Sequence, residues 1–220
     1  MSELETRQEN ADFLEHVYFE LWQAAGASEE HARAVARGVS LGDRMGKLTQ
    51  GMGVLDAIFY SLEAGCLDMN VVPQIVDEGP TWALYDGGTS TGCWTLEMAT
   101  KTAIEKAREY GIAIAMDCNH NDAGSFYTYT SLAIEQDMMA IATNSSVPLT
   151  APWAGRENKI SGAPFSAATP GGEEYLLVAD IACIEVNDGN WSEAAYNGTR
   201  LPVKCMVDPD TFELTDDPAP

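Results

Sequence analysis

The stretch of residues 111–172 most constrains how this chain can fold. It opens with the apolar run 111–116, which is too short for a free-standing helix, is flanked by breakers and therefore predicts a buried strand. A polar loop follows at 117–122, then a segment with helical spacing over 125–137 and a second apolar strand over 138–142. This order places side chains at strand ends, where ligands are commonly bound.

Four polar residues of this region and of the strand that follows it are the candidates for a site. His120 lies in the loop, and Asn144 and Ser145 follow the second strand. Asp180 interrupts a further apolar strand predicted over 175–181, where an unpaired carboxylate would be costly to bury. The alternatives are structural: a histidine beside acids is often a hydrogen-bonded loop residue, and Asn144 and Ser145 can simply turn the chain.

The rest of the chain predicts a helical start, a sheet and a loop-rich end. Ser28 is the expected N-cap of a second helix, which places Ala32, Val35, Ala36 and Val39 inward. Other helices are expected at 54–64, at 94–110 and at 13–26, where an apolar stripe is formed by Phe13, Leu14, Val17, Tyr18, Leu21 and Trp22. Strands are expected at 70–76 and 81–85, separated by a turn at 77–80. We therefore divide the chain into a helical region 1–69, a sheet-containing domain 70–186 and a loop-rich segment 187–220.

A glycine-rich loop at residues 86–92 lies between a predicted strand and a predicted helix. Backbone N–H groups at such a position can bind a phosphate. The spacing is not that of a dinucleotide-binding fingerprint, so close packing of the strand against the helix is the alternative.

The charge balance excludes several kinds of partner. The chain has 34 acidic against 12 basic residues and a formal net charge of −22. Such a surface repels phosphate backbones and anionic lipids, so we expect neither nucleic-acid nor membrane partners. A salt-rich environment or a partner with a basic surface would each account for the acidity.

The remaining composition favours a cytoplasmic protein without a metal. No apolar segment approaches the roughly 20 residues that span a bilayer, and the N-terminus is polar and acidic, unlike a signal peptide. The five cysteines are scattered, which favours reduced thiols, and neither cysteines nor histidines have zinc-ligand spacing. Asp117, His120 and Asp122 offer too few oxygen ligands for a hard cation, so no metal is expected.

Several short motifs occur in the order typical of one family. They are the run 105–116, Asn119-His120, Ala123-Gly124, Thr143-Asn144-Ser145, Ala151-Pro152-Trp153-Ala154-Gly155-Arg156, Pro170-Gly171-Gly172 and Leu177-Val178-Ala179-Asp180. Together they resemble the malate/L-lactate dehydrogenase family, which includes ureidoglycolate, sulfolactate and piperideine-2-carboxylate members. The resemblance extends from about residue 28 to residue 218.

The resemblance implies an α/β fold with a helical N-terminal region and a mixed, non-Rossmann sheet. It further implies an NAD or NADP cofactor, hydride transfer to or from a small 2-oxo acid, 2-hydroxy acid or imine, and an oligomer, usually a homodimer. The domain 70–186 would then carry the cofactor and substrate site.

Carried over residue by residue, the family's motifs assign the candidate site. Thr143, Asn144 and Ser145 match its cofactor-side Thr-Asn-Ser. Gly162 lies in Ser-Gly-Ala-Pro, where the family reads Gly-Thr-Asn-Pro. His120 matches a loop histidine, although Asn121-Asp122 replace Phe-Gly, and Asp180 matches the aspartate of Asp-Met-Ala-Thr.

The largest departure is catalytic. Gln50 stands where the family has the histidine of Ser-His-Gly, and Val54 stands where it has an arginine. Glutamine cannot titrate near neutrality and valine cannot pair with a carboxylate, although a reductase of this kind needs both a proton donor and a cation. Gln50 can still hydrogen-bond a ligand.

Two interpretations fit these losses. In the first, the chain is one subunit of a hetero-oligomeric dehydrogenase, and a second chain supplies what is missing. In the second, the scaffold has left redox chemistry. It is then a hydratase or lyase using His120 with Asp117, Asp122 or Asp180, or a non-catalytic binding subunit.

Overall fold

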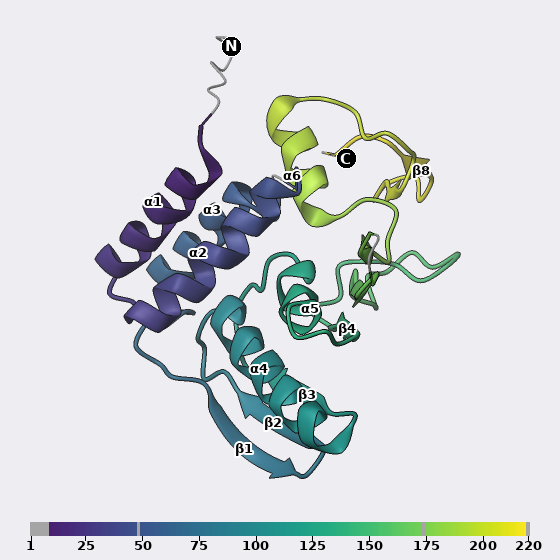
Figure 1. Cartoon of the computed structure of the whole chain (residues 1–220). Coiled ribbons are helices and arrows are strands. Elements are labelled where there is room, and N and C mark those ends of the chain that lie inside the picture. The colour runs from purple at the N-terminus through teal and green to yellow at the C-terminus, as the bar shows by residue number, and fades with distance from the viewer. Residues whose placement is uncertain (1–8, 48, 173–174, 219–220) are drawn as a thin grey trace. The chain divides into compact units, whose positions relative to one another are not determined.

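The computed structural model describes residues 9–47, 49–172 and 175–218, and the chain forms two compact units, Met1–Leu132 and Ala133–Pro220. Figure 1 shows the helices and strands along the chain. The three-part division at 69/70 and 186/187 stays a prediction about how the chain is organised. In the described part of the chain, no helix is long and apolar enough to cross a membrane.

The first unit begins with helices that form because their ends are capped and one face is apolar. The helices are α1 (Ala11–Ala24), α2 (Glu29–Arg44), the 3-10 turn η1 (Met52–Val54) and α3 (Leu55–Glu63). The Ser28 side chain accepts from the N–H of His31, which confirms it as the N-cap of α2. The four residues expected to face inward on α2 are all buried.

The core between these helices is built around Trp22, which is fully buried and stacks on Phe59 with ring centroids 4.8 Å apart. Tyr18 packs in the same cluster. The expectation of a continuous apolar stripe along α1 is wrong in part, because Phe13, Val17 and Leu21 are exposed. Only one flank of α1 meets α2, so every third or fourth residue is covered and the others are not.

A three-stranded sheet with the order β1-β2-β3 follows in the same unit. Its strands are β1 (Gln74–Gly79), β2 (Trp82–Asp86) and β3 (Ile114–Cys118), and the sheet is mixed because β1 pairs antiparallel and β3 parallel with β2. Helix α4 (Gly92–Tyr110) packs on Ala83 and Tyr85 through Ala99 and ends at Gly111, whose φ of 85° is left-handed.

The predicted boundaries of β1 are wrong at both ends. The strand begins after Pro73, because proline has no N–H to donate to a ladder. It continues through residues 77–79, which were expected to turn but pair with residues 82–84 of β2.

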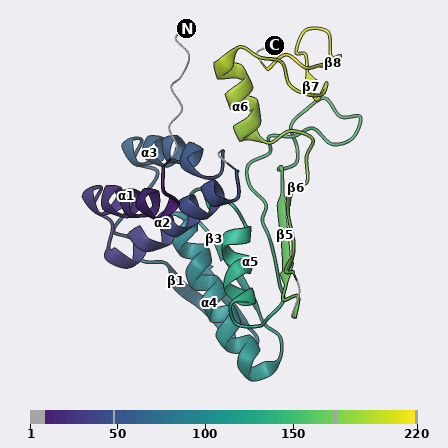
Figure 2. The ribbon, with the colours of Figure 1, turned by 45° about the horizontal axis from the view of Figure 1, so that its top comes forward.

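The second unit holds an antiparallel sheet with the order β4-β5-β6. Helix α5 (Tyr127–Ile134) precedes β4 (Ala140–Thr143), β5 (Pro164–Thr169) and β6 (Leu177–Ala182), and β5 and β6 run side by side in Figure 2. The segment after β6 contains α6 (Asp188–Asn197), β7 (Met206–Val207) and β8 (Leu214–Thr215). Strand β5 and helix α6 were not predicted.

The expectation that β6 is a buried strand is also wrong. Its residues alternate between exposed and half-buried, and Leu177 and Ile181 are exposed. The run is apolar apart from Asp180, but only one face of the strand is covered by the described residues.

Candidate functional site

His120 lies just beyond β3 in the loop 118–126 that leads to α5. Its ring Nε2 is 2.7 Å from Oδ1 of Asp117, the residue that β3 presents three positions earlier. Its Nδ1 is 2.8 Å from the carbonyl oxygen of Asn121. Asn119 turns the chain between them with a left-handed φ of 56°, a conformation that asparagine tolerates better than most residues.

The partners of His120 favour its charged form. A carbonyl oxygen and an ionised carboxylate only accept hydrogen bonds, so both ring nitrogens carry protons in this arrangement. Burial lowers the pKa of His120, but the hydrogen bonds to Asp117 and to the Asn121 carbonyl, together with the nearby carboxylates, outweigh it and the net pKa is raised. Asp117 therefore holds a proton at Nε2 of His120 in this arrangement.

Replacing Asp117 by asparagine is expected to lower the pKa of His120, because the charge and the strongest acceptor are lost together. The measurement is an NMR titration of the His120 ring. Asp122→Asn is the matched control: Asp122 acts on the ring only through space, and an asparagine oxygen can still accept from the N–H of Gly124. A larger effect from Asp122→Asn than from Asp117→Asn would contradict the assignment.

The contact between His120 and Asp117 also makes the free energy of unfolding depend on pH in a defined direction. Because the folded pKa of His120 is raised, its contribution is fully present below the unfolded pKa of about 6.5 and is lost as the pH rises through the folded pKa.

The glycine-rich loop 86–92 packs tightly against the His120 loop. The N–H groups of Gly87, Thr89 and Gly92 donate to the carbonyls of Cys118, Asn119 and Asp122, respectively. In return, the N–H of Asn121 donates to the Ser90 carbonyl. A Cβ on Gly87 would lie 2.8 Å from Cβ of His120. Because these N–H groups donate to carbonyls of the chain itself, they are not available to a phosphate. The loop is therefore explained by close packing of the strand against the helix.

Gln50 lies beside the same loop. Its carbonyl oxygen lies 3.6 Å from the position that a Cβ on Gly124 would occupy. The first unit therefore brings together the turn that carries Gln50 and the loop that carries His120, although residues 51–117 separate them in the sequence.

Val54 does not face a polar site. It is 6% exposed and packs in the helical core with Ile58 and Val35. The position at which the family motif carries an arginine is therefore part of the hydrophobic core in this chain, and a charged side chain placed there would be buried among apolar atoms.

The cofactor-side candidates gather at one end of the β4-β5-β6 sheet in the second unit. Thr143 ends β4 and donates from Oγ1 to the carbonyl of Pro164, which begins β5, at 2.8 Å. Asn144 follows with a buried Oδ1 that has no hydrogen-bond partner among the described residues, and Ser145 is exposed. Gly162 precedes β5, and a Cβ there would lie 2.7 Å from Cδ1 of Ile184.

Asp180 lies inside β6, not at its end. It pairs with Ser166 of β5, which is fully buried and in turn pairs with Ala142 of β4. Asp180 therefore lies on the covered face of this sheet, whereas Thr143, one row away, lies on the exposed face. The structure divides the candidate residues between the units: Gln50 and His120 lie in the first, and Thr143, Asn144, Ser145, Gly162 and Asp180 lie in the second.

Two residues that anchor the His120 loop and the turn of Gln50 were missed by the sequence reasoning. Asn121 donates from Nδ2 to the carbonyls of Cys66 and Thr89 and so ties its loop to two other segments. Asp43 anchors the turn that carries Gln50 through the N–H of Met52. Neither has a local sequence signal, because their partners lie elsewhere in the fold.

Comparison with known proteins gives consistent results. Residues 10–220 match the family model described as malate/L-lactate dehydrogenase. The chain is 30% identical over 191 residues to the L-sulfolactate dehydrogenase of Methanocaldococcus jannaschii, covering 87% of this chain and 55% of that protein. It is 33% identical over 178 residues to the malate dehydrogenase of Pyrococcus abyssi, covering 80% of this chain and 49% of that protein.

A solved structure shows the same fold. The malate dehydrogenase of Entamoeba histolytica superposes with a TM-score of 0.90 at 22% identity, covering 97% of this chain and 59% of that one. The predicted fold, a helical N-terminal region followed by mixed sheets, is confirmed. The chain spans only about half to three-fifths of the length of these relatives.

Proposed function

Because the chain belongs to the malate/L-lactate dehydrogenase family, we propose that it binds NAD or NADP and a small 2-oxo acid or 2-hydroxy acid as part of an oxidoreductase. The relatives named above are dehydrogenases of malate or sulfolactate. In this proposal Thr143, Asn144, Ser145 and Gly162 of the second unit contact the cofactor. Gln50 and His120 of the first unit, and Asp180 of the second, are each candidates for contact with the substrate.

One observation carries the cofactor part of the proposal. The Oδ1 atom of Asn144 is buried, yet it accepts no hydrogen bond from the described residues. A buried acceptor without a donor costs about 1–3 kcal/mol, so such atoms are expected where a ligand supplies the donor. The hydroxyl and amide donors of a nicotinamide nucleotide are suitable partners. The cofactor when bound would supply the hydride chemistry, and this chain would orient it.

His120 supplies the polar chemistry on the substrate side. Asp117 holds its ring as a proton-bearing group, and the His120 side chain is 13% exposed. Gln50 adds an uncharged amide on the neighbouring turn. This combination can hydrogen-bond a carbonyl or hydroxyl oxygen, and His120 can release a proton when its contact with Asp117 is broken.

We further propose that the chain works with a second polypeptide, either a different subunit or another copy of itself. Ile141, Leu177 and Ile181 are exposed on one face of the β4-β5-β6 sheet, which supports association through apolar contact. The net charge of −22 supports a partner with a basic surface. Native mass spectrometry of the purified protein tests this: a second, basic chain supports the hetero-oligomer, a mass of two identical chains supports the homodimer, and a monomer alone contradicts both.

The burial of Val54 favours a second candidate function. Without a cation at this position, and with Gln50 in place of a titrating group, the scaffold would serve as a non-redox hydratase or lyase built on His120, or as a binding subunit. In either case no nicotinamide cofactor would be needed.

Titration with NADH and with NADPH, followed by cofactor fluorescence, distinguishes these candidates. We expect saturable binding that Asn144→Ala weakens about tenfold, since one hydrogen bond in a buried site contributes roughly 1.4 kcal/mol. Ser146→Ala is the matched control, because Ser146 is exposed and adjacent but lies outside the Thr-Asn-Ser motif. No fluorescence change at millimolar cofactor, with any co-purifying chain retained, would overturn the dehydrogenase proposal.

A further inference from the structure

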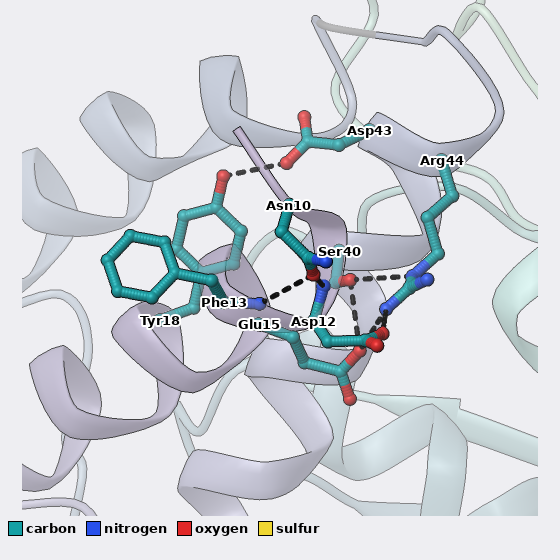
Figure 3. A network of polar contacts seen from close by, with 8 residues as sticks. All are labelled: Asn10, Asp12, Phe13, Glu15, Tyr18, Ser40, Asp43 and Arg44. Atoms are coloured by element: carbon teal, nitrogen blue, oxygen red, sulfur yellow. Dashed lines mark hydrogen bonds and ion pairs between the residues drawn. The ribbon is translucent and has the colours of Figure 1, made fainter. Parts of the chain in front are cut away.

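Two polar links join helices α1 and α2, and they differ in what else they touch (Figure 3). In one, Arg44 binds Asp12 and Glu15 at 2.5 and 3.2 Å, and Ser40 donates to Glu15. This link lies between the two helices alone. In the other, the Tyr18 hydroxyl donates to Oδ2 of Asp43 at 2.7 Å, and we call these two residues the Tyr18–Asp43 pair.

The Tyr18–Asp43 pair reaches the turn that carries Gln50. The second carboxylate oxygen of Asp43, Oδ1, accepts from the N–H of Met52 at 2.8 Å. The carbonyl of Lys47 accepts from both Gln50 and Gly51, at 2.8 Å each. The N–H of Lys47 donates to the carbonyl of Gly42 at 2.9 Å, so both ends of the turn around Gln50 are tied to α2.

Two glycines allow this close approach. A Cβ on Gly42 would lie 2.6 Å from the carbonyl oxygen of Gln50, and a Cβ on Gly51 would collide with the carboxylate of Asp43. A side chain at either position would push the turn away from α2. The backbone of Gln50 therefore packs directly against α2, with its carbonyl beside Gly124 of the His120 loop.

Tyr18 makes the Asp43 carboxylate a fixed anchor. Its side chain is 3% exposed and packs in the helical core, so the hydroxyl has a defined position. Burial and the hydrogen bond to Asp43 raise the pKa of Tyr18, which keeps the hydroxyl protonated and donating at all physiological pH values. Both carboxylate oxygens of Asp43 therefore have a hydrogen-bond donor. Oδ2 accepts from Tyr18 of α1, and Oδ1 accepts from the N–H of Met52 in the turn.

We propose that Asp43, oriented by Tyr18, is a positioning residue that holds Gln50 beside the loop of His120. Neither residue of the pair is placed in contact with substrate. This inference rests on the proposed function for its significance, since it matters to a ligand only if Gln50 and His120 share one. The geometry of the turn itself can be tested without any ligand.

The test compares Tyr18→Phe and Asp43→Asn with Glu15→Gln, which weakens the other link between the same two helices. Hydrogen exchange of the Met52 amide and the NMR resonances of the Gln50 side-chain amide are measured for each protein, together with its thermal unfolding midpoint. We expect Asp43→Asn and Tyr18→Phe to speed exchange of the Met52 amide by up to about tenfold and to shift the Gln50 resonances. Glu15→Gln should leave the exchange rate of the Met52 amide within twofold of that in the unmodified protein and should not shift the Gln50 resonances. This should hold even where the unfolding midpoint falls by a similar amount.

A uniform response of all three variants would overturn the proposal, because it would show a general loosening of the α1–α2 contact. Unchanged Met52 exchange in Asp43→Asn would overturn it as well, unless Asp43→Ala, which removes both oxygens, produces the expected change. Failure of NAD(P)H to bind the unmodified protein would defeat the proposed function but not this result, which is read from the free protein. If cofactor and 2-oxo acid do bind, Tyr18→Phe should weaken binding of the 2-oxo acid and leave cofactor binding unchanged.

Discussion

Replacing Gly92 by alanine is expected to destabilise the first unit by about 3 kcal/mol, because the new methyl group would collide with backbone that cannot move aside. A Cβ at this position would lie 2.5 Å from the carbonyl oxygen of Asn121 and 2.8 Å from that of Asp122. The N–H of Gly92 also donates to the Asp122 carbonyl, so moving the loop would break that bond. The substitution should therefore displace the loop that holds His120.

The measurement is urea unfolding, with the NMR shift of the His120 ring as a report on the loop. Gly38→Ala is the matched control, since it adds the same methyl group in the middle of α2. Its nearest neighbour is a side-chain atom, Sγ of Cys93 at 3.3 Å, and helix propensity favours alanine. We expect a change within about 1 kcal/mol for the control. A cost for Gly92→Ala no larger than for Gly38→Ala would contradict the packing described for the two loops.

His31→Ala is expected to cost about 3 kcal/mol or more at pH 7 through lost packing and two orphaned polar groups. His31 is fully buried, stacks on Trp94 and joins three segments. Its Nδ1 is 3.2 Å from the Met69 carbonyl, so Nδ1 carries the proton, and Nε2 accepts from the hydroxyl of Thr91 at 2.7 Å. Thr91 is the N-cap of α4, so the loss should propagate to the start of that helix.

The same residue gives a pH dependence of known sign. Burial lowers the pKa of His31, and the hydrogen bond to the Met69 carbonyl only partly opposes it. The contribution of His31 is therefore present above the unfolded pKa of about 6.5 and is lost as the pH falls through the folded pKa. This is the opposite sign to His120, whose contribution is lost as the pH rises.

Unfolding free energies at pH 7 and pH 5 test this assignment. The decrease between the two values should be smaller in His31→Gln than in the unmodified protein, because glutamine does not titrate. His31→Gln also serves where His31→Ala is too unstable to purify. His16→Ala is the control, since His16 is exposed on α1 and its removal should leave the decrease unchanged. An unaltered decrease in His31→Gln would contradict the assignment.

Local patterns were sufficient for the elements whose causes are local. Helix α2 could be predicted because its inward residues recur at helical spacing and Ser28 caps it, and α4 because Gly111 ends it. The contact of His120 with Asp117 spans three residues and was within reach of the sequence. The family resemblance likewise rests on motifs in sequence order, and the match over residues 10–220 confirms it.

Elements and contacts that depend on distant partners were not predictable. Strand β5 has neither a clear alternation nor a run of branched residues, and it is a strand because β4 and β6 pair with its two edges. The hydrogen bond from the N–H of Met52 to Asp43 forms only because the turn after α2 packs against that helix. No local periodicity in the sequence predicts this contact.

The sequence by itself determined the family, the helical beginning of the chain and the identities of the candidate site residues, because periodicity, capping and motif order are properties of neighbours along the chain. Only the tertiary structure decided which residues meet: that Gln50 lies beside the His120 loop, that Val54 belongs to the core and that Asn144 buries an oxygen to which none of the described residues donates. These facts depend on which backbone segments pack together, and that choice minimises the free energy of the whole fold rather than of any one segment.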